Sequence, residues 1–346
     1  MGLGGVLGGM TVELTLACTG YDWTRPLWDG TVDPDGIDLR VVDYHNPERF
    51  ARMVEDEEFD ACELSLGSYL ASRSRETPAS FTAIPVFPYR KFRHSFIYRR
   101  AGDDVTLADL EGADVGLINW QTTTAIWQRG IAADRYGVDL ETVTWHTLKP
   151  EGNIVPMAIP DRFDVVEDYR PGGTTDAFVS MLEAGEIDVA FSTSPLSTRV
   201  IGGRHDDPDG TESPATDTVE RVFEDPMAVE ADYYRETGIF PPMHVIVIDD
   251  DVLERNPWVA GTLYDGFEAA LEVCMDRLTK PRWFPLAWAN QHVEHQREVL
   301  GESPWEYGLT EDNRTAMEAL QRYAADHGII RSPYAPDELF VESTLS

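Results

Sequence analysis

The chain has 346 residues, which is too long for one simple core and suits two lobes or domains. It carries 62 acidic and 28 basic residues, a net charge of −34, and lysine stands only at Lys91, Lys149 and Lys280. This acid excess argues against a nucleic-acid or anionic-membrane partner. An acid excess in which arginine is kept and lysine is dropped is typical of adaptation to a high-salt cytoplasm, where salt screens the self-repulsion of the protein.

Cysteine usage and the lack of long apolar runs limit the class further. Cys18, Cys62 and Cys274 lie far apart and form no CxxC motif, so we expect buried thiols and not disulfides or a thiolate metal site. No apolar run approaches the length of a membrane span. The first ten residues lack the basic start of a signal peptide, although Met10 is an alternative start. We therefore expect a cytoplasmic protein.

The first hundred residues predict strands that alternate with helices. A helix over 47–57 places Phe50, Met53 and Val54 on one face, and Ser65 or Ser68 can cap a helix that follows the third strand. The expected strands are 12–17, 37–42, 59–64 and 95–99.

A cationic loop precedes the last of these strands. In the stretch IPVFPYRKFRHSFIYR, Arg90, Lys91, Arg93 and His94 stand within five residues, among prolines and aromatic residues that stiffen the chain. A rigid cationic loop in an acidic protein favours a site for a small anion. The alternative is a surface loop whose arginines pair with nearby acids.

The rest of the chain continues the alternation. We expect an irregular segment over Gly152 to Gly173 and a mobile acidic loop over His205 to Asp217. A strand with a rigid, proline-containing entry is expected from Gly238 to Ile248, and in this respect it resembles the cationic loop and the strand that follows it. The other expected strands are 113–118, 143–146 and 187–191, and the expected helices are 106–112, 119–136, 176–184, 257–277, 292–300 and 313–327.

This order predicts an α/β fold with mainly parallel sheets, in which ligands lie at the carboxyl ends of strands. The two proline-stiffened segments would be the crossings between two lobes that close on a cleft: residues 1–98 with 244–346 form one, and residues 99–243 the other. The polar strand ends that would meet there are Tyr21 with Arg25, Glu63 with Ser65 and Ser68, Gln121 with Thr122 and Thr123, Ser192 with Thr193, and the surroundings of His94 and His244.

This arrangement resembles the type II periplasmic-binding-protein fold, and several motifs resemble the 4,5-dihydroxyphthalate decarboxylase family more closely. The resemblance runs from about Val12 to Leu345 and departs from the family pattern near Gly152 to Gly173 and His205 to Asp217. The motifs are YDWTRPLWDG, FDACELSLGSYL, IPVFPYRKFRHSFIY, WQTTTAIWQRGIAADRYGV, TGIFPPMHVIVI, NPWVAGTLYDGFEAA and WEYGLTEDNR with DELF.

The resemblance implies removal of one of two adjacent carboxylates from a dihydroxylated ring, with a ring hydroxyl as electron source and no organic cofactor. The protein must hold a dianion, protonate a ring carbon and accept a phenol proton. His94 and His244 are the expected acid and base. The expected substrate-binding residues are Arg25, Arg90 and Arg93 for the carboxylates, Tyr21 for a ring hydroxyl, and Ser65, Ser68, Gln121, Thr122 and Thr193 for neutral hydrogen bonds.

Several alternatives stay open. Arg25 can instead pair with Asp22 or Asp29, and the serine and threonine positions can be helix caps. The pair His292 and His295 has helical spacing for a metal but lacks a third ligand, so we expect a solvent face and no metal site. The same cleft also suits a solute-binding protein of transporter type, a cytoplasmic carboxylate sensor, or an enzyme that acts on another carboxylated metabolite.

Overall fold

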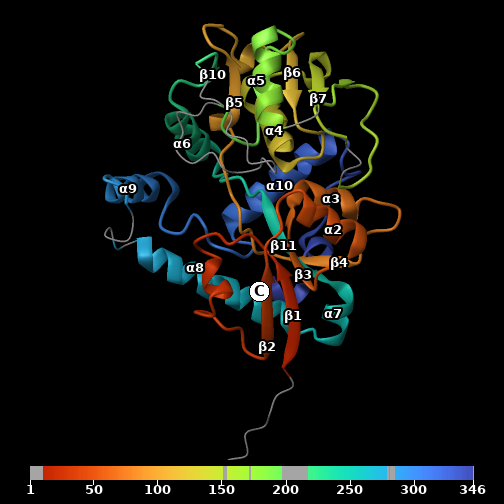
Figure 1. Ribbon diagram of the computed structural model, residues 1–346, viewed down its shortest axis with the longest axis vertical. Helices are drawn as coiled ribbons and strands as arrows, with labels where there is room; N and C mark the ends of the chain where they lie inside the picture. The colour runs from red at the N-terminus through yellow and green to blue at the C-terminus, as the bar shows by residue number, and fades with distance from the viewer. Residues whose placement is uncertain are drawn as a thin grey trace, which may run out of the picture.

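The computed structural model describes residues 11–150, 154–170, 173–196, 217–278, 280 and 285–345. Figure 1 shows two stacked lobes, each built on its own β-sheet with helices packed around it. The acidic loop predicted at His205 to Asp217 lies outside the described residues, apart from Asp217 itself. We call the part with the five-stranded sheet lobe 1 and the part with the six-stranded sheet lobe 2.

The sheet of lobe 1 has the strand order β2-β1-β3-β11-β4. Strands β2, β1 and β3 pair in parallel, and β11 runs antiparallel between β3 and β4. All five residues of β3 are buried, as expected for a strand covered on both faces. The strands are β1 (Val12–Ala17), β2 (Ile37–Val42), β3 (Ala61–Ser65), β4 (Phe81–Ile84) and β11 (His244–Asp249).

The sheet of lobe 2 has the order β10-β5-β9-β6-β7-β8. Strands β9, β6, β7 and β8 are parallel, whereas β5 is antiparallel to both β9 and β10. The strands are β5 (Ile97–Arg100), β6 (Asp114–Leu117), β7 (Thr144–Thr147), β8 (Asp164–Glu167), β9 (Val189–Phe191) and β10 (Val219–Arg221).

Helices follow most strands, and α10 contacts helices of both lobes. Helix α10 packs against α3 of lobe 1 and α4 of lobe 2, and α9 packs on α6. The helices are α1 (Arg25–Trp28), α2 (Glu48–Asp56), α3 (Leu66–Arg73), α4 (Thr123–Tyr136), α5 (Thr174–Ala184), α6 (Pro226–Thr237), α7 (Asp250–Arg255), α8 (Val259–Leu278), α9 (Ala289–Leu300), α10 (Glu311–Asp326) and α11 (Pro336–Leu339).

Two chain segments connect the lobes and run side by side. Residues 85–96 lead from β4 to β5, and residues 222–243 lead from β10 back to β11. Their backbones are hydrogen-bonded: Lys91 N donates to Pro241 O over 3.0 Å, and Met243 N donates to Tyr89 O over 2.8 Å. The cationic loop of the sequence is therefore one of these connections.

The lobes also touch directly where β3 and β6 end. The Oγ atoms of Ser65 and Thr123 are 2.8 Å apart, and Gly67 N donates to Thr123 Oγ1 over 2.8 Å. A Cβ atom on Gly67 would lie 2.1 Å from the carbonyl oxygen of Gln121. Only glycine therefore permits this close approach of α3 to α4.

The sequence predicted most of the parallel strands of both sheets, including the edge strand β2, but it did not predict the edge strands β4, β8 and β10. The segment predicted to be irregular contains β8, a short strand whose residues are half-buried or exposed and so give no apolar signal. Helix α6 was not predicted, because only Ala231 and Tyr233 of it are buried. Cys18, Cys62 and Cys274 are buried free thiols, as expected. Among the described helices none combines the length and apolar character that crossing a bilayer requires.

Candidate functional site

A buried carboxylate, Glu63, is the centre of the candidate site. Its side chain is 0% exposed, and it lies on β3 near the carboxyl end of the strand. Oε2 accepts hydrogen bonds from Arg49 Nη2 over 2.9 Å and from Thr19 N over 2.8 Å. Oε1 accepts from Tyr21 Oη over 2.8 Å and from His244 Nδ1 over 2.6 Å. The register places His244 opposite Ser65, on the face of the sheet that Glu63 shares.

The charge of Glu63 is maintained by its neighbours. Burial alone would raise the pKa of this carboxyl group. The Arg49 guanidinium and the hydrogen bonds from His244 and Thr19 outweigh burial, so the pKa lies below its usual range. Glu63 is therefore ionised at neutral pH and acts only as an acceptor.

His244 is held in one tautomer. An ionised carboxylate has no proton to donate, so the hydrogen on Nδ1 must belong to the imidazole and point at Glu63. Burial lowers the pKa of His244, the Glu63 carboxylate raises it, and Arg49 and Arg93 lower it, with a net shift downwards. At neutral pH the ring is therefore neutral, and Nε2 is its acceptor nitrogen.

Aromatic rings extend the site along lobe 1. The rings of Tyr21 and Tyr89 are nearly parallel with centroids 5.8 Å apart, and the Tyr89 ring lies 5.0 Å from that of His244. Trp23 also stacks on Tyr21, with ring centroids 4.8 Å apart, and Phe50 meets the His244 ring edge-on at 5.2 Å. Burial and the neighbouring Glu63 raise the pKa of Tyr21 well above its usual value, so its hydroxyl stays a donor.

Arg93 lies beside this cluster. It is 2% exposed, and its Nε and Nη2 atoms are 3.0 and 2.6 Å from Sδ of Met243, the residue before His244. Nη1 donates to the backbone oxygen of Thr193 over 3.4 Å. A thioether sulfur is a weak acceptor for a guanidinium. A bound carboxylate would therefore be a stronger partner for these donors.

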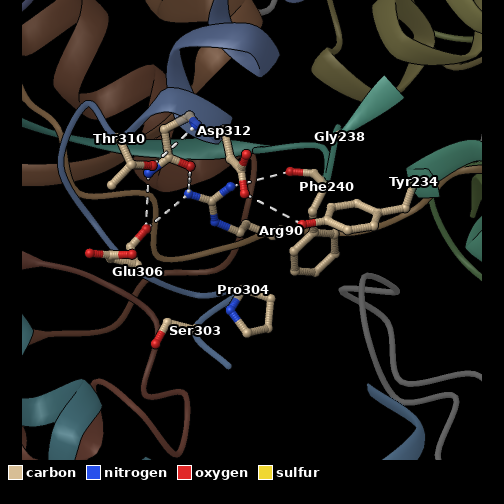
Figure 2. Close-up of a pocket in the computed structure, with 10 residues that line it drawn as sticks. Arg90, Tyr234, Gly238, Phe240, Ser303, Pro304, Glu306, Thr310 and Asp312 are labelled. Atoms are coloured by element: carbon tan, nitrogen blue, oxygen red, sulfur yellow. Dashed lines mark hydrogen bonds between the residues drawn. The ribbon is translucent and has the colours of Figure 1, made fainter. Parts of the chain in front are cut away.

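Arg90 is placed differently from Arg93. Figure 2 shows its guanidinium between the loop of residues 238–240 and the start of α10. It donates to Asn313 Oδ1 over 2.6 Å and to the backbone oxygens of Phe240 and Glu306. Burial lowers the pKa of Arg90 to about 10. The adjoining cavity has a volume of about 30 Å³, enough for a water molecule and not for an aromatic ring.

His94 lies in an apolar setting. It is 0% exposed, and its ring contacts those of Phe223 and Tyr233 with centroids 5.6 and 5.1 Å away. Neither ring nitrogen has a hydrogen-bond partner among the described residues. Burial, with a smaller contribution from Arg135, lowers the pKa of His94 to about 4.

This burial predicts a pH-dependent contribution to stability. Between pH 6.5 and 4 the unfolded chain binds a proton at His94 that the folded chain does not, so folding becomes less favourable as the pH falls. The full difference is about 3 kcal/mol. In denaturant titrations we expect His94→Phe to gain stability relative to the parent protein by up to this amount between pH 6.5 and 4. A constant difference across that range would contradict the prediction.

The remaining predicted residues bond to other parts of the chain or face solvent. The side chain of Arg25 is 58% exposed, with Nε 4.0 Å from Asp22, the pairing expected as its alternative. Ser65 bonds to Thr123 across the lobes, and Ser68 Oγ has no partner among the described residues. Gln121 Nε2 donates to Val155 O over 2.7 Å, and Thr122 bonds to Asn119.

The structure thus brings Tyr21 and His244 together on Glu63, with Arg93 adjacent. Glu63 was recognised in the sequence only as part of a polar strand end, and Arg49 was not recognised at all. A charged residue inside an otherwise apolar strand was the available signal for Glu63. No cluster of three metal-ligating side chains occurs in the part of the chain that the structure describes. A hollow of about 340 Å³ lies beside Arg75 and Arg331, and neither Glu63 nor any of the residues described around it lines this hollow.

Comparison with solved structures supports the fold. The chain is 14% identical to the desulfurization enzyme DszB with a TM-score of 0.52, covering 96% of this chain and 97% of DszB. It is 12% identical to the periplasmic sulfonate-binding protein SsuA of Methylobacillus flagellatus, with a TM-score of 0.55 and coverage of 97% of this chain and 94% of SsuA. The fold is therefore that of periplasmic binding proteins, as the sequence predicted.

Comparison with curated proteins identifies the family. No family model matches the chain. A 4,5-dihydroxyphthalate decarboxylase of Pseudomonas putida is 31% identical over 227 residues, 65% of this chain and 82% of the relative. A 4,5-dihydroxyphthalate decarboxylase of Comamonas testosteroni is 31% identical over 341 residues, 96% of this chain and 98% of the relative. The chain therefore belongs to the 4,5-dihydroxyphthalate decarboxylase family.

Proposed function

We propose that the protein decarboxylates an aromatic dicarboxylate, 4,5-dihydroxyphthalate or a close analogue, without an organic cofactor. The observation that carries the proposal is the Glu63 carboxylate shared by Tyr21 and a neutral His244. Membership of the decarboxylase family supports the reaction class, and the aromatic residues beside the histidine suit a ring-shaped substrate.

His244 is the proposed base. Its Nε2 accepts the proton of a ring hydroxyl, and Glu63 stabilises the imidazolium that results. The electron pair of the phenolate oxygen moves into the ring, and the ring carbon para to it takes up a proton. The bond from that carbon to the carboxylate then breaks, CO₂ leaves and the ring becomes aromatic again. The imidazolium returns its proton to the product, so the net reaction consumes one proton from solvent.

Arg93 is the proposed anchor for the substrate's carboxylates. It is buried, and its Nε and Nη2 atoms contact the sulfur of Met243, the residue that precedes His244. This sulfur is a weak acceptor. A dicarboxylate bound there would lie within the electrostatic reach of His244, whose pKa Arg93 already affects. The charge of the dianion and the proton-transfer group would thus be next to each other.

We infer that the substrate enters when the lobes separate, because only 12% of the His244 side chain is exposed. The hydrogen bond between Ser65 and Thr123 and the contact at Gly67 join lobe 1 to lobe 2 beside the cluster. The described form is therefore closed, and opening about the two connecting segments would expose the site. Closure over the ring would exclude water from the charged intermediate.

The direct test incubates purified protein in high-salt buffer made with D₂O and 4,5-dihydroxyphthalate. We expect release of CO₂ and formation of 3,4-dihydroxybenzoate with one deuterium at the vacated ring position. Calorimetry on the same sample measures binding separately. Tight binding with no product would instead support the solute-binding or sensor function that the fold also permits.

A further inference from the structure

Arg49 on α2 is the charged group most completely enclosed beside the site. Its side chain is 0% exposed, and its Nη2 atom pairs with Glu63 Oε2 over 2.9 Å. Nε donates to the backbone oxygen of Glu63 over 3.2 Å, and Nη1 donates to Thr19 Oγ1 over 2.9 Å and to Tyr44 O over 3.2 Å. The fork thus grips Glu63 at both its backbone and its carboxylate.

The two oxygens of Glu63 have separate partners as a result. Oε2 is fixed by Arg49 and the Thr19 amide, on the side away from the imidazole. Oε1 is left for Tyr21 and His244. A buried ion pair contributes little net stability, because desolvation offsets most of the Coulomb attraction. Orientation of the carboxylate accounts for this pair better than stability does.

We propose that Arg49 is a positioning residue, which clamps Glu63 so that Oε1 meets Nδ1 of His244 and Nε2 is the nitrogen presented to the substrate. This inference deepens the proposed function and rests on it for the role of Nε2. Arg49 itself touches no group that would react, and it acts through Glu63.

The charges around His244 determine the direction in which its pKa would move if Arg49 were removed. The charged or titratable groups near the imidazole are Glu63 from β3, Arg49 from α2, Arg93 and Tyr89 from the first connecting segment, and Tyr21 from the loop after β1. Arg49 lowers the pKa of His244, and it offsets the Glu63 charge that would raise it. Without Arg49 only Arg93 would oppose the charge of the Glu63 carboxylate, so the protonated form of the imidazole would be favoured.

The test compares Arg49→Gln, Arg49→Lys and the parent protein by nitrogen NMR of ¹⁵N-histidine-labelled, ligand-free samples, with the His244 signals assigned through His244→Asn. In the parent we expect a hydrogen on Nδ1 and a titration midpoint below the ordinary histidine value. In Arg49→Gln the midpoint should rise by about one pH unit or more. In Arg49→Lys, which keeps the positive charge, the midpoint should lie close to that of the parent.

Turnover kinetics provide a second, independent test of the role of Arg49. We expect Arg49→Gln to lower kcat by roughly 10- to 100-fold with KM changed less than about threefold, as for other residues that orient a functional group. Arg52→Met is the matched control, because Arg52 lies on the same helix and pairs with Glu58 on its outer side. It should leave both the His244 spectrum and kcat unchanged.

A folded Arg49→Gln protein with the parent's tautomer and midpoint would overturn the inference. If Arg49→Gln does not fold, Arg49→Lys decides: a single ammonium cannot replace the fork, so a mixed tautomer and a lower kcat support the clamp, and parent-like values of both overturn it. Because the spectra need no substrate, an inactive parent protein would overturn the proposed reaction while the role of Arg49 is still tested.

Discussion

Replacing His244 with asparagine is expected to lower kcat by roughly 10²- to 10⁴-fold while the protein still folds and binds its substrate. Asparagine can still donate a hydrogen bond to Glu63, so the buried carboxylate keeps a partner. What it lacks is a basic nitrogen at the position of Nε2. Glu63→Gln should produce a loss in the same direction, because an amide cannot stabilise the imidazolium.

The measurement is the initial rate of CO₂ release across pH, with binding followed separately by calorimetry. The parent's kcat/KM should decline on the acid side, as protonation of His244 removes the base. His292→Gln on the exposed part of α9 is the matched control and should behave like the parent. A His244→Asn protein that retains the parent's kcat would exclude His244 as the base.

Local sequence pattern was sufficient to find the residues that end strands. Tyr21 follows β1 and His244 begins β11, and both reach Glu63 because the carboxyl ends of β1 and β3 meet at the edge of the sheet where β11 starts. Pattern failed for Arg49. Its helix, ERFARMVED, has the alternating charges of a surface helix. Arg49 lies one turn before the apolar Met53, but a charged residue at the border of an apolar face usually reaches solvent, so the spacing did not single it out.

The cationic loop illustrates the same limit within one stretch. Arg90 and Arg93 are three residues apart and equally buried, yet Arg90 turns to Asn313 of α10 and Arg93 to Met243. The partner of Arg90 lies more than 200 positions along the chain. His94 likewise packs against Tyr233 on α6, a helix that sequence reasoning did not predict. Which cation or imidazole faces the site thus depends on tertiary contacts between distant segments.

Arg93→Met is expected to weaken binding of a dicarboxylate by tenfold or more, since a charged hydrogen bond contributes on the order of 1.5–3 kcal/mol. Methionine is an unbranched apolar side chain that can occupy the space beside Met243 and Phe96, and it removes the guanidinium together with its contacts to the sulfur and the ring. The probe is phthalate, which has both carboxylates and lacks the hydroxyl that drives the reaction, so binding is measured without turnover. Calorimetry at two salt concentrations should show a weaker salt dependence for the variant.

Lys91→Met provides the matched control from the same loop. It removes the same formal charge two residues away, from an ammonium that lies 4.6 Å from the ring centre of Phe96. A general effect of positive charge on an acidic protein would weaken phthalate binding equally in both variants. A direct contact with Arg93 would weaken it in Arg93→Met alone, with Arg93→Lys intermediate because an ammonium cannot form the two parallel bonds of a guanidinium. Equal dissociation constants for Arg93→Met and the parent would remove Arg93 from the site.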